Sequence, residues 1–88
     1  MDERMIMGVF LRNRLAEAGE VQDVFTRYGC SIKTRIGLHD TGSESCSASG
    51  LIILELRGEA SEKEKLEKEL TGIEGVEVGK MTFKTGPA

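Results

Sequence analysis

Three side chains in this sequence combine the donor chemistry that soft metal ions accept: His39, Cys46 and Cys30. Imidazole nitrogen and thiolate sulfur are suitable ligands for such ions. The spacing argues against a site, because the sequence contains neither a CxxC pair nor an HxH pair. Three donors in one chain also fall short of a closed site unless a second subunit supplies ligands. We therefore expect no bound metal and no other cofactor.

Arg35 carries the most specific binding chemistry in the chain, because a planar guanidinium suits bidentate recognition of a carboxylate or phosphate. Residues 31–39 alternate, with one set of positions occupied by Lys33, Arg35, Gly37 and His39. Period-two alternation is typical of a strand with one buried face. We therefore predict that Arg35 faces away from the helix-covered core. Gly37, on the same face, would leave space for a ligand or a neighbouring backbone.

A second strand is predicted to extend this outward face. Leu51 and Ile53 would add apolar area between its charges, which water does not favour. Either the face is solvated, with an arginine paired to Glu55, or it contacts a partner. We expect a homo-oligomer, a dimer or a tetramer, because a small core gains stability from self-association. A small-molecule effector is the second expected partner. The candidate ligand- or interface-binding residues are Arg35, Gly37, His39, Leu51, Ile53 and Arg57.

No catalytic arrangement stands out. The sequence shows no ordered Ser, His and acid set and no nucleophile elbow, and its many carboxylates lie on expected helix surfaces. Its glycines form neither a GxGxxG pattern nor a P-loop. We expect a protein that is not an enzyme. A small ferredoxin-like hydrolase or isomerase is the alternative, and it lacks a plausible acid–base pair.

The residues above must be positioned by six expected elements. Apolar runs and alternation predict strands over residues 5–11, 31–39, 51–57 and 76–83. One helix is expected after Asn13, its N-cap, and another after a capping box formed by Ser61 and Glu64. The order β-α-β-β-α-β predicts an α+β fold: a ferredoxin-like sandwich with a four-stranded antiparallel sheet and two helices on one face.

The last strand is expected to change phase at Gly79. The apolar residues at 76 and 78 share one parity, and those at 81 and 83 share the other. A β-bulge at the glycine would bring both pairs to the same face.

Size and charge exclude several classes of protein. A chain of 88 residues forms one domain over 1–88, with an ordered core over about 4–84. A net charge of −3 disfavours direct binding of nucleic acid. The longest wholly apolar run is Leu51 to Leu54, which is too short for a membrane span or a secretory signal. Two cysteines do not make a secreted disulfide scaffold, so we expect a cytoplasmic location.

Two segments resemble known families. Val24-Phe-Thr-Arg-Tyr-Gly-Cys-Ser-Ile-Lys-Thr-Arg35-Ile-Gly37 resembles the iron-only hydrogenase system regulators, in which a helix ending in Tyr-Gly leads into a strand with Arg-x-Gly. The second half, Leu54-Glu-Leu-Arg-Gly-Glu59 and Gly75-Val-Glu-Val-Gly-Lys-Met81, is similar to the C-terminal effector domain of nickel-responsive repressors. The resemblance implies the ACT-like version of the ferredoxin-like fold. It also implies a stand-alone regulatory module that binds an effector and oligomerises, acting in transcriptional or metabolic regulation.

The chain departs from the nickel repressors at their metal site. Those repressors use a His-x-His strand and a Cys before the third strand. Here Gly37 and His39 occupy the matching stretch, and Gly50 stands where the Cys would be. A metal-sensing domain related to these repressors is the alternative function, and it would require His39 and Cys46 as ligands. The repressors' DNA-binding segment has no counterpart before the first expected strand, so DNA binding is not implied.

Overall fold

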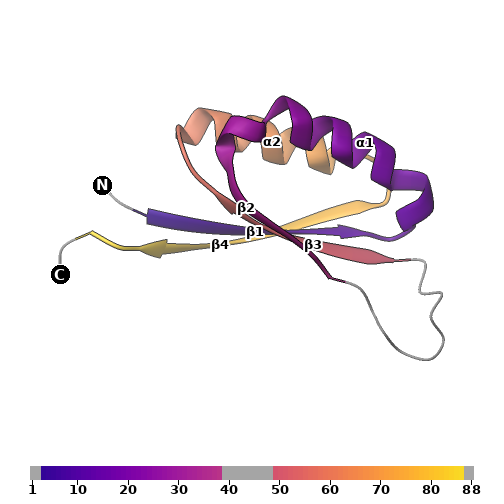
Figure 1. Ribbon diagram of the computed structural model, residues 1–88, viewed down its shortest axis with the longest axis horizontal. Helices are drawn as coiled ribbons and strands as arrows, with labels where there is room; N and C mark the ends of the chain where they lie inside the picture. Colours follow the sequence, from indigo (N-terminus) through magenta and orange to yellow (C-terminus); the bar gives the residue numbers. More distant parts are fainter. Residues whose placement is uncertain (1–2, 39–48, 87–88) are drawn as a thin grey trace.

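The computed structural model describes residues 3–38 and 49–86, which form one sheet with both helices packed on one of its faces (Figure 1). The elements are β1 (Glu3–Leu11), α1 (Arg14–Arg27), a short 3-10 helix (Gly29–Ser31), β2 (Ile32–Leu38), β3 (Gly50–Leu56), α2 (Ala60–Thr71) and β4 (Val76–Lys84). The strand order is β2-β3-β1-β4, and every neighbouring pair is antiparallel. The predicted ferredoxin-like fold is confirmed.

The core lies between the sheet and the two helices. Apolar side chains alternate along β1 and β3, and the helices contribute stripes at helical spacing. Each partner thereby presents one apolar face, and burial of these faces is the main driving force for folding. The buried apolar residues are Met7, Val9, Leu11, Val21, Val24, Phe25, Leu54, Leu56, Leu66, Leu70 and Ile73.

The start of α1 is fixed by side-chain hydrogen bonds. The Asn13 side-chain oxygen accepts from the Ala16 N–H at 3.3 Å, as predicted for an N-cap. The Glu17 carboxylate in turn accepts from the Asn13 N–H at 3.1 Å. Glu17 is only 8% exposed, because the turn before β4 packs over it at Gly75.

The start of α2 differs from the prediction. The helix begins at Ala60 with Glu59 as its N-cap, and no side chain makes a capping hydrogen bond. The capping box of Ser61 and Glu64 is therefore wrong. Gly58, with φ of +96°, turns the chain immediately before Glu59 and so sets an earlier helix start.

The bulge predicted at Gly79 is also wrong. The pairing of β1 with β4 is unbroken from Glu3 with Lys84 to Leu11 with Val76, and Gly79 pairs with Gly8. The two apolar pairs of β4 consequently lie on opposite faces of the sheet. Residues 76 and 78 pack against the core, whereas Met81 and Phe83 are 54% and 52% exposed.

Neither helix within residues 3–38 and 49–86 is long and apolar enough to cross a membrane.

Candidate functional site

A β-bulge in β2 decides where Arg35 lies. Ile32 pairs with Leu56, but the next pair joins Thr34 to Glu55, so Lys33 is the extra residue of β2. After the bulge, Arg35 pairs with Leu54, a wholly buried residue of the helix-covered face. Residues that pair directly share a face of the sheet. The prediction that Arg35 faces away from the helices is therefore wrong.

The Arg35 guanidinium carbon lies 4.9 Å from the centre of the Phe25 ring on α1. A guanidinium over an aromatic face at this distance forms a cation–π interaction. No ion pair joins Arg35 to a carboxylate among residues 3–38 and 49–86. The arginine is therefore held in place on one side by the ring, while its donors remain available to a ligand.

Arg35 and Gly37 line a recess of about 330 Å³ between α1 and the edge of the sheet formed by β2 and β3. Gly37 pairs with Ile52, so it also lies on the helix side. A side chain at Gly37 would meet no atom within 4 Å, so open space lies above it. Among the described residues, the lining is made up of Leu11, Arg14, Ala18, Val21, Gln22, Arg35, Gly37, Leu38, Gly50, Leu51 and Ile52.

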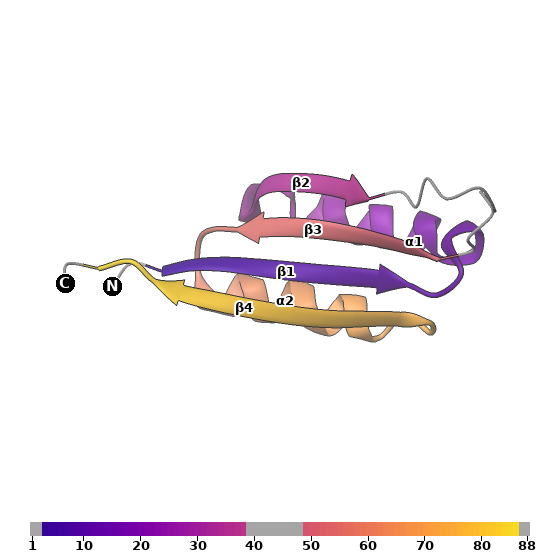
Figure 2. The same ribbon diagram turned by 90° about the horizontal axis from the view of Figure 1, so that it is seen from below.

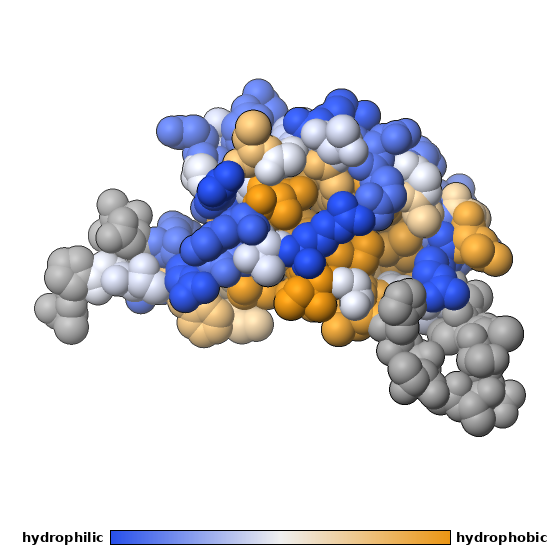
Figure 3. Space-filling model, in the orientation of Figure 1, coloured by the Kyte–Doolittle hydropathy of each residue, from blue (hydrophilic) through white to orange (hydrophobic). Residues whose placement is uncertain are grey.

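The opposite face of the sheet is not covered by either helix, and Figure 2 shows all four strands uncovered from that side. We call it the open face. The strand pairing assigns it eight large apolar side chains. Hydrophobic residues are visible along the lower side of the molecule in Figure 3. Ile36 and Leu38 are 51% and 48% exposed there. The eight are Ile6, Phe10, Ile36, Leu38, Leu51, Ile53, Met81 and Phe83.

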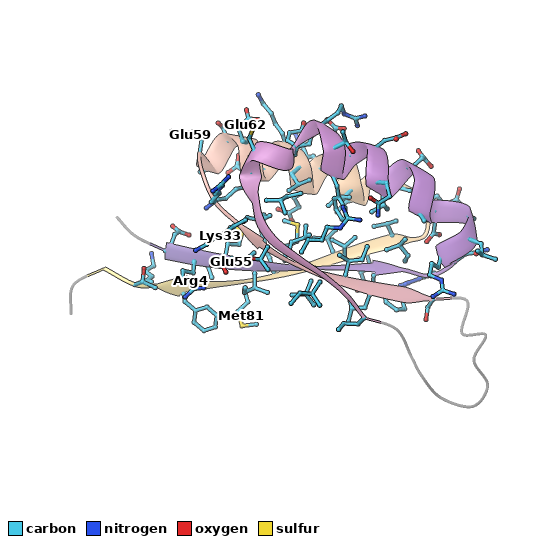
Figure 4. The ribbon with its side chains drawn as sticks, in the orientation of Figure 1. Arg4, Lys33, Glu55, Glu59, Glu62 and Met81 are labelled. Atoms are coloured by element: carbon cyan, nitrogen blue, oxygen red, sulfur yellow. The ribbon has the colours of Figure 1, made fainter. Side chains whose placement is uncertain are left out.

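Charged pairs border this apolar area. Arg4 donates two hydrogen bonds to the Glu55 carboxylate, at 2.7 and 2.9 Å. The hydrogen bond from Arg4 lowers the pKa of Glu55 below its ordinary value. Arg12 pairs with Glu77 at 2.8 Å at the other end of the sheet. In Figure 4, Arg4 and Glu55 lie close together and Met81 projects away from the helices.

A second recess, of about 590 Å³, lies at the start of α2 and has a mixed lining. It contains five acidic and five basic side chains, among them the internally paired Arg4 and Glu55 and the pair formed by Lys80 and Glu67 at 2.7 Å. Arg57 belongs here, and it donates from Nε to the Cys30 carbonyl at 3.2 Å. Because acidic and basic side chains are equal in number here, the lining has no excess of either charge by which to select a ligand.

The structure thus divides the predicted site residues. Arg35 and Gly37 line the recess beside α1, Ile53 lies on the open face, and Leu51 belongs to both. Arg57 is separate from them, at the opposite end of β3. His39 and Cys46 lie outside the described residues. Among the residues that the structure describes, no cluster of three or more His, Cys, Asp or Glu side chains could hold a metal ion.

Several members of the open face were missed in the sequence. Ile36 and Leu38 alternate with Arg35 and Gly37, so the predicted outward face of Arg35 would place them on the core side; the bulge at Lys33 reverses this. Met81 and Phe83 gave a usable signal, because their parity opposes that of residues 76 and 78 in the same strand. Apolar residues on both faces of one strand indicate that both faces of the strand are buried.

No family model matches the chain, and no curated protein matches it. Solved structures with the same fold do match. An uncharacterized protein, TM1266, from Thermotoga maritima superposes with a TM-score of 0.79 at 20% identity, over 94% of this chain and 100% of that one. CPII from Thiomonas intermedia K12, a nitrogen regulatory PII-like protein bound to ADP, AMP and bicarbonate, gives 0.59 at 16% identity, over 98% of both chains.

A formyltetrahydrofolate deformylase from Pseudomonas putida KT2440 gives a TM-score of 0.55 at 16% identity, over 89% of this chain and 28% of the deformylase. The same fold therefore occurs in a stand-alone regulatory protein and in part of an enzyme. At these identities the likeness shows the fold alone, and function has to be argued from the chain's own surfaces.

Proposed function

We propose that this chain is a small regulatory module that self-associates through its open face and binds a small-molecule effector beside α1. The observation that carries the proposal is the open face itself, with eight large apolar side chains on the side of the sheet that no helix covers. Contiguous apolar patches of this kind mark interaction sites, because water does not stabilise them.

The dimensions of the open face suit a second copy of the chain. Four strands about 4.8 Å apart and about seven residues of about 3.3 Å rise give a flat area on the order of 400 Å² per copy. Side-chain relief increases the accessible area above this value, toward the roughly 800 Å² per partner of stable interfaces. Two sheets packed face to face form an ordinary arrangement about 10 Å thick.

The relief of the open face favours close contact. Gly8 pairs with Ile53 on one side and with Gly79 on the other, so two positions without side chains lie beside a bulky one. A twofold axis through this area would let Ile53 of each copy approach the glycines of the other. In a symmetric dimer the same patch serves both partners, so this hollow and this projection would both be used.

The effector part of the proposal rests on the recess that Arg35 lines. Leu38 and Leu51 belong to the open face and also line the recess. A ligand in the recess would therefore contact residues of the assembling surface, which gives a physical route from binding to assembly. CPII, the PII-like neighbour, was solved with small molecules bound, which agrees with an effector role for this fold.

Membership of the iron-only hydrogenase system regulators is part of the same proposal. It is supported by the Tyr-Gly and Arg-x-Gly segments and by a fold that also occurs in CPII, a nitrogen regulatory PII-like protein. We further propose a single domain that acts in the cytoplasm by binding rather than by catalysis, without direct contact to nucleic acid. Net charge of −3 supports the last point.

Sedimentation velocity at micromolar concentrations tests the proposal. We expect the wild type to sediment as a dimer or tetramer, and Ile53→Asp to weaken assembly by roughly a hundredfold in Kd, because a carboxylate would be buried at the centre of the interface. The matched control is Leu15→Asp, which makes the same kind of change at an α1 residue that is 90% exposed. A wild type that is monomeric throughout, or equal effects of both variants, would refute the proposal.

A further inference from the structure

The recess beside α1 has an uneven distribution of polar groups. Its floor and walls are largely aliphatic: Leu11 and Val21 are buried, and Ala18 and Ile52 are partly buried. A binding site of this kind fixes a ligand by a few polar groups and gains affinity from apolar contact.

The charges that line the recess are all positive. Arg35 and Arg14 both contribute to the lining, and no Asp or Glu among the described residues does so. A cationic ligand would therefore be repelled by the Arg35 guanidinium, whereas an anion would be attracted to it. Because this guanidinium is held over Phe25, it loses little conformational freedom when a ligand binds.

The volume limits the size of the ligand. About 330 Å³ corresponds to about eleven water-sized groups at about 30 Å³ each. A carboxylate with a short alkyl chain fits into that space. Gly37 and Gly50 maintain the space, and a side chain at Gly50 would press on the Arg14 methylenes at 3.3 Å.

Given the effector role proposed above, we propose that the recess binds a short-chain alkyl carboxylate. The carboxylate accepts hydrogen bonds from the Arg35 guanidinium, and the alkyl chain lies on Ala18, Leu51 and Ile52, which are only partly buried. A phosphate would satisfy Arg35 equally well, but it would leave the partly exposed apolar lining at Leu51 and Ile52 in water. The combination of one fixed cation and an aliphatic floor therefore selects the carboxylate.

Isothermal titration calorimetry with sodium butanoate, pentanoate and hexanoate tests the ligand class. We expect Kd to fall by about fourfold for each added methylene, since each one leaves water for the aliphatic floor. Butylamine and hexylamine, with the same chains and the opposite charge, should not bind. Inorganic phosphate should bind more weakly than hexanoate.

Three variants locate the site. Arg35→Met keeps a long side chain near Phe25 and should weaken hexanoate binding by at least tenfold, while Arg35→Lys should restore part of it. Gly37→Val should block binding, because its side chain fills the space above β2. Lys33→Met, which removes a cation outside the recess, should bind as the wild type does.

The proposal fails if the amines bind as tightly as the acids, if Kd does not change with chain length, or if Arg35→Met binds like the wild type. Sedimentation of the same samples separates this failure from failure of the proposed function. If the wild type assembles but no carboxylate binds at millimolar concentration, the ligand class is wrong while the self-associating module stands. If hexanoate binds with the expected dependence on Arg35 but the chain stays monomeric, the ligand class is right and the proposed self-association is wrong.

Discussion

Replacing Gly75 with alanine should destabilise the fold through two effects that can be measured separately. Gly75 has φ of +89°, a conformation that costs a residue with a side chain about 1–2 kcal/mol. A Cβ at this position would also lie 1.7 Å from Oε2 of Glu17. The carboxylate must move, and its hydrogen bond from the Asn13 N–H, about 1 kcal/mol, is lost or weakened.

The expected total for Gly75→Ala is about 2–3 kcal/mol, which corresponds to a fall in Tm of roughly 10–20 °C for a domain of this size. Gly58→Ala is the matched control. Gly58 has nearly the same backbone conformation, with φ of +96°, but an added Cβ there would meet nothing within 4 Å. It should therefore cost only the backbone part, about 1–2 kcal/mol.

Urea unfolding at one fixed protein concentration gives both values, and the fixed concentration removes any contribution from assembly. In a Glu17→Ala background, where the carboxylate is absent, Gly75→Ala should cost no more than Gly58→Ala. The reasoning is refuted if Gly75→Ala is no more destabilising than Gly58→Ala in the wild-type background, or if Glu17→Ala leaves the cost of Gly75→Ala unchanged.

Other predictions concern charge, helix propensity and metal content. Tyr28, the only tyrosine, donates a hydrogen bond to Glu69 at 2.6 Å, and this hydrogen bond raises the Tyr28 pKa. Ultraviolet titration of the phenol should therefore give a pKa above about 10, and the pKa should fall in Glu69→Gln. The hydrogen bonds from Tyr28 and Arg27 lower the Glu69 pKa, so the stability they contribute is present above about pH 4.3 and is lost as the pH falls below it. In urea unfolding, the free energy of unfolding of Glu69→Gln should therefore depend less on pH in the acid range than that of the wild type. Equal pH dependence of the two proteins would contradict this. Gly19→Ala should raise stability by about 0.5–1 kcal/mol in urea unfolding, because an added Cβ meets no atom within 4 Å in the helix; a loss of stability would show that the site is not open. Elemental analysis of the purified protein should find no stoichiometric nickel, zinc or iron, and one metal per chain that is lost in Cys46→Ser would overturn this.

Much of the fold follows from the sequence because its signals are local. The alternation in β1 and β3 and the helical stripe of α1 depend on spacing along the chain, and Asn13 caps α1 as its side-chain chemistry predicts. The first residue of α2 does not follow from the local pattern. The capping-box pattern at Ser61 predicts a later start, but the turn at Gly58, two residues before the helix, sets the start at Ala60.

The position of Arg35 could not be derived from alternation. Alternation places the apolar set of β2 toward the helices and the polar set toward water only when one face of the sheet is buried and the other is solvated. In this sheet the open face is itself apolar, and β2 is an edge strand whose helix side is only partly covered, so a cation can lie there beside Phe25. The bulge at Lys33 makes this exchange of faces possible, and no single residue type in the strand marks it.

The role of the open face can be tested most directly at isoleucine methyl groups labelled with carbon-13. A soluble nitroxide broadens the NMR signals of methyls that reach water. Ile36 is 51% exposed in a single chain and lies on the open face, whereas Ile73 is 7% exposed inside the core. If the open face is the self-association surface, the Ile36 methyl of the wild type should be as protected as that of Ile73, and Ile53→Asp should expose Ile36 but not Ile73. An Ile36 methyl that is fully accessible in a sample shown by sedimentation to be oligomeric would contradict the account.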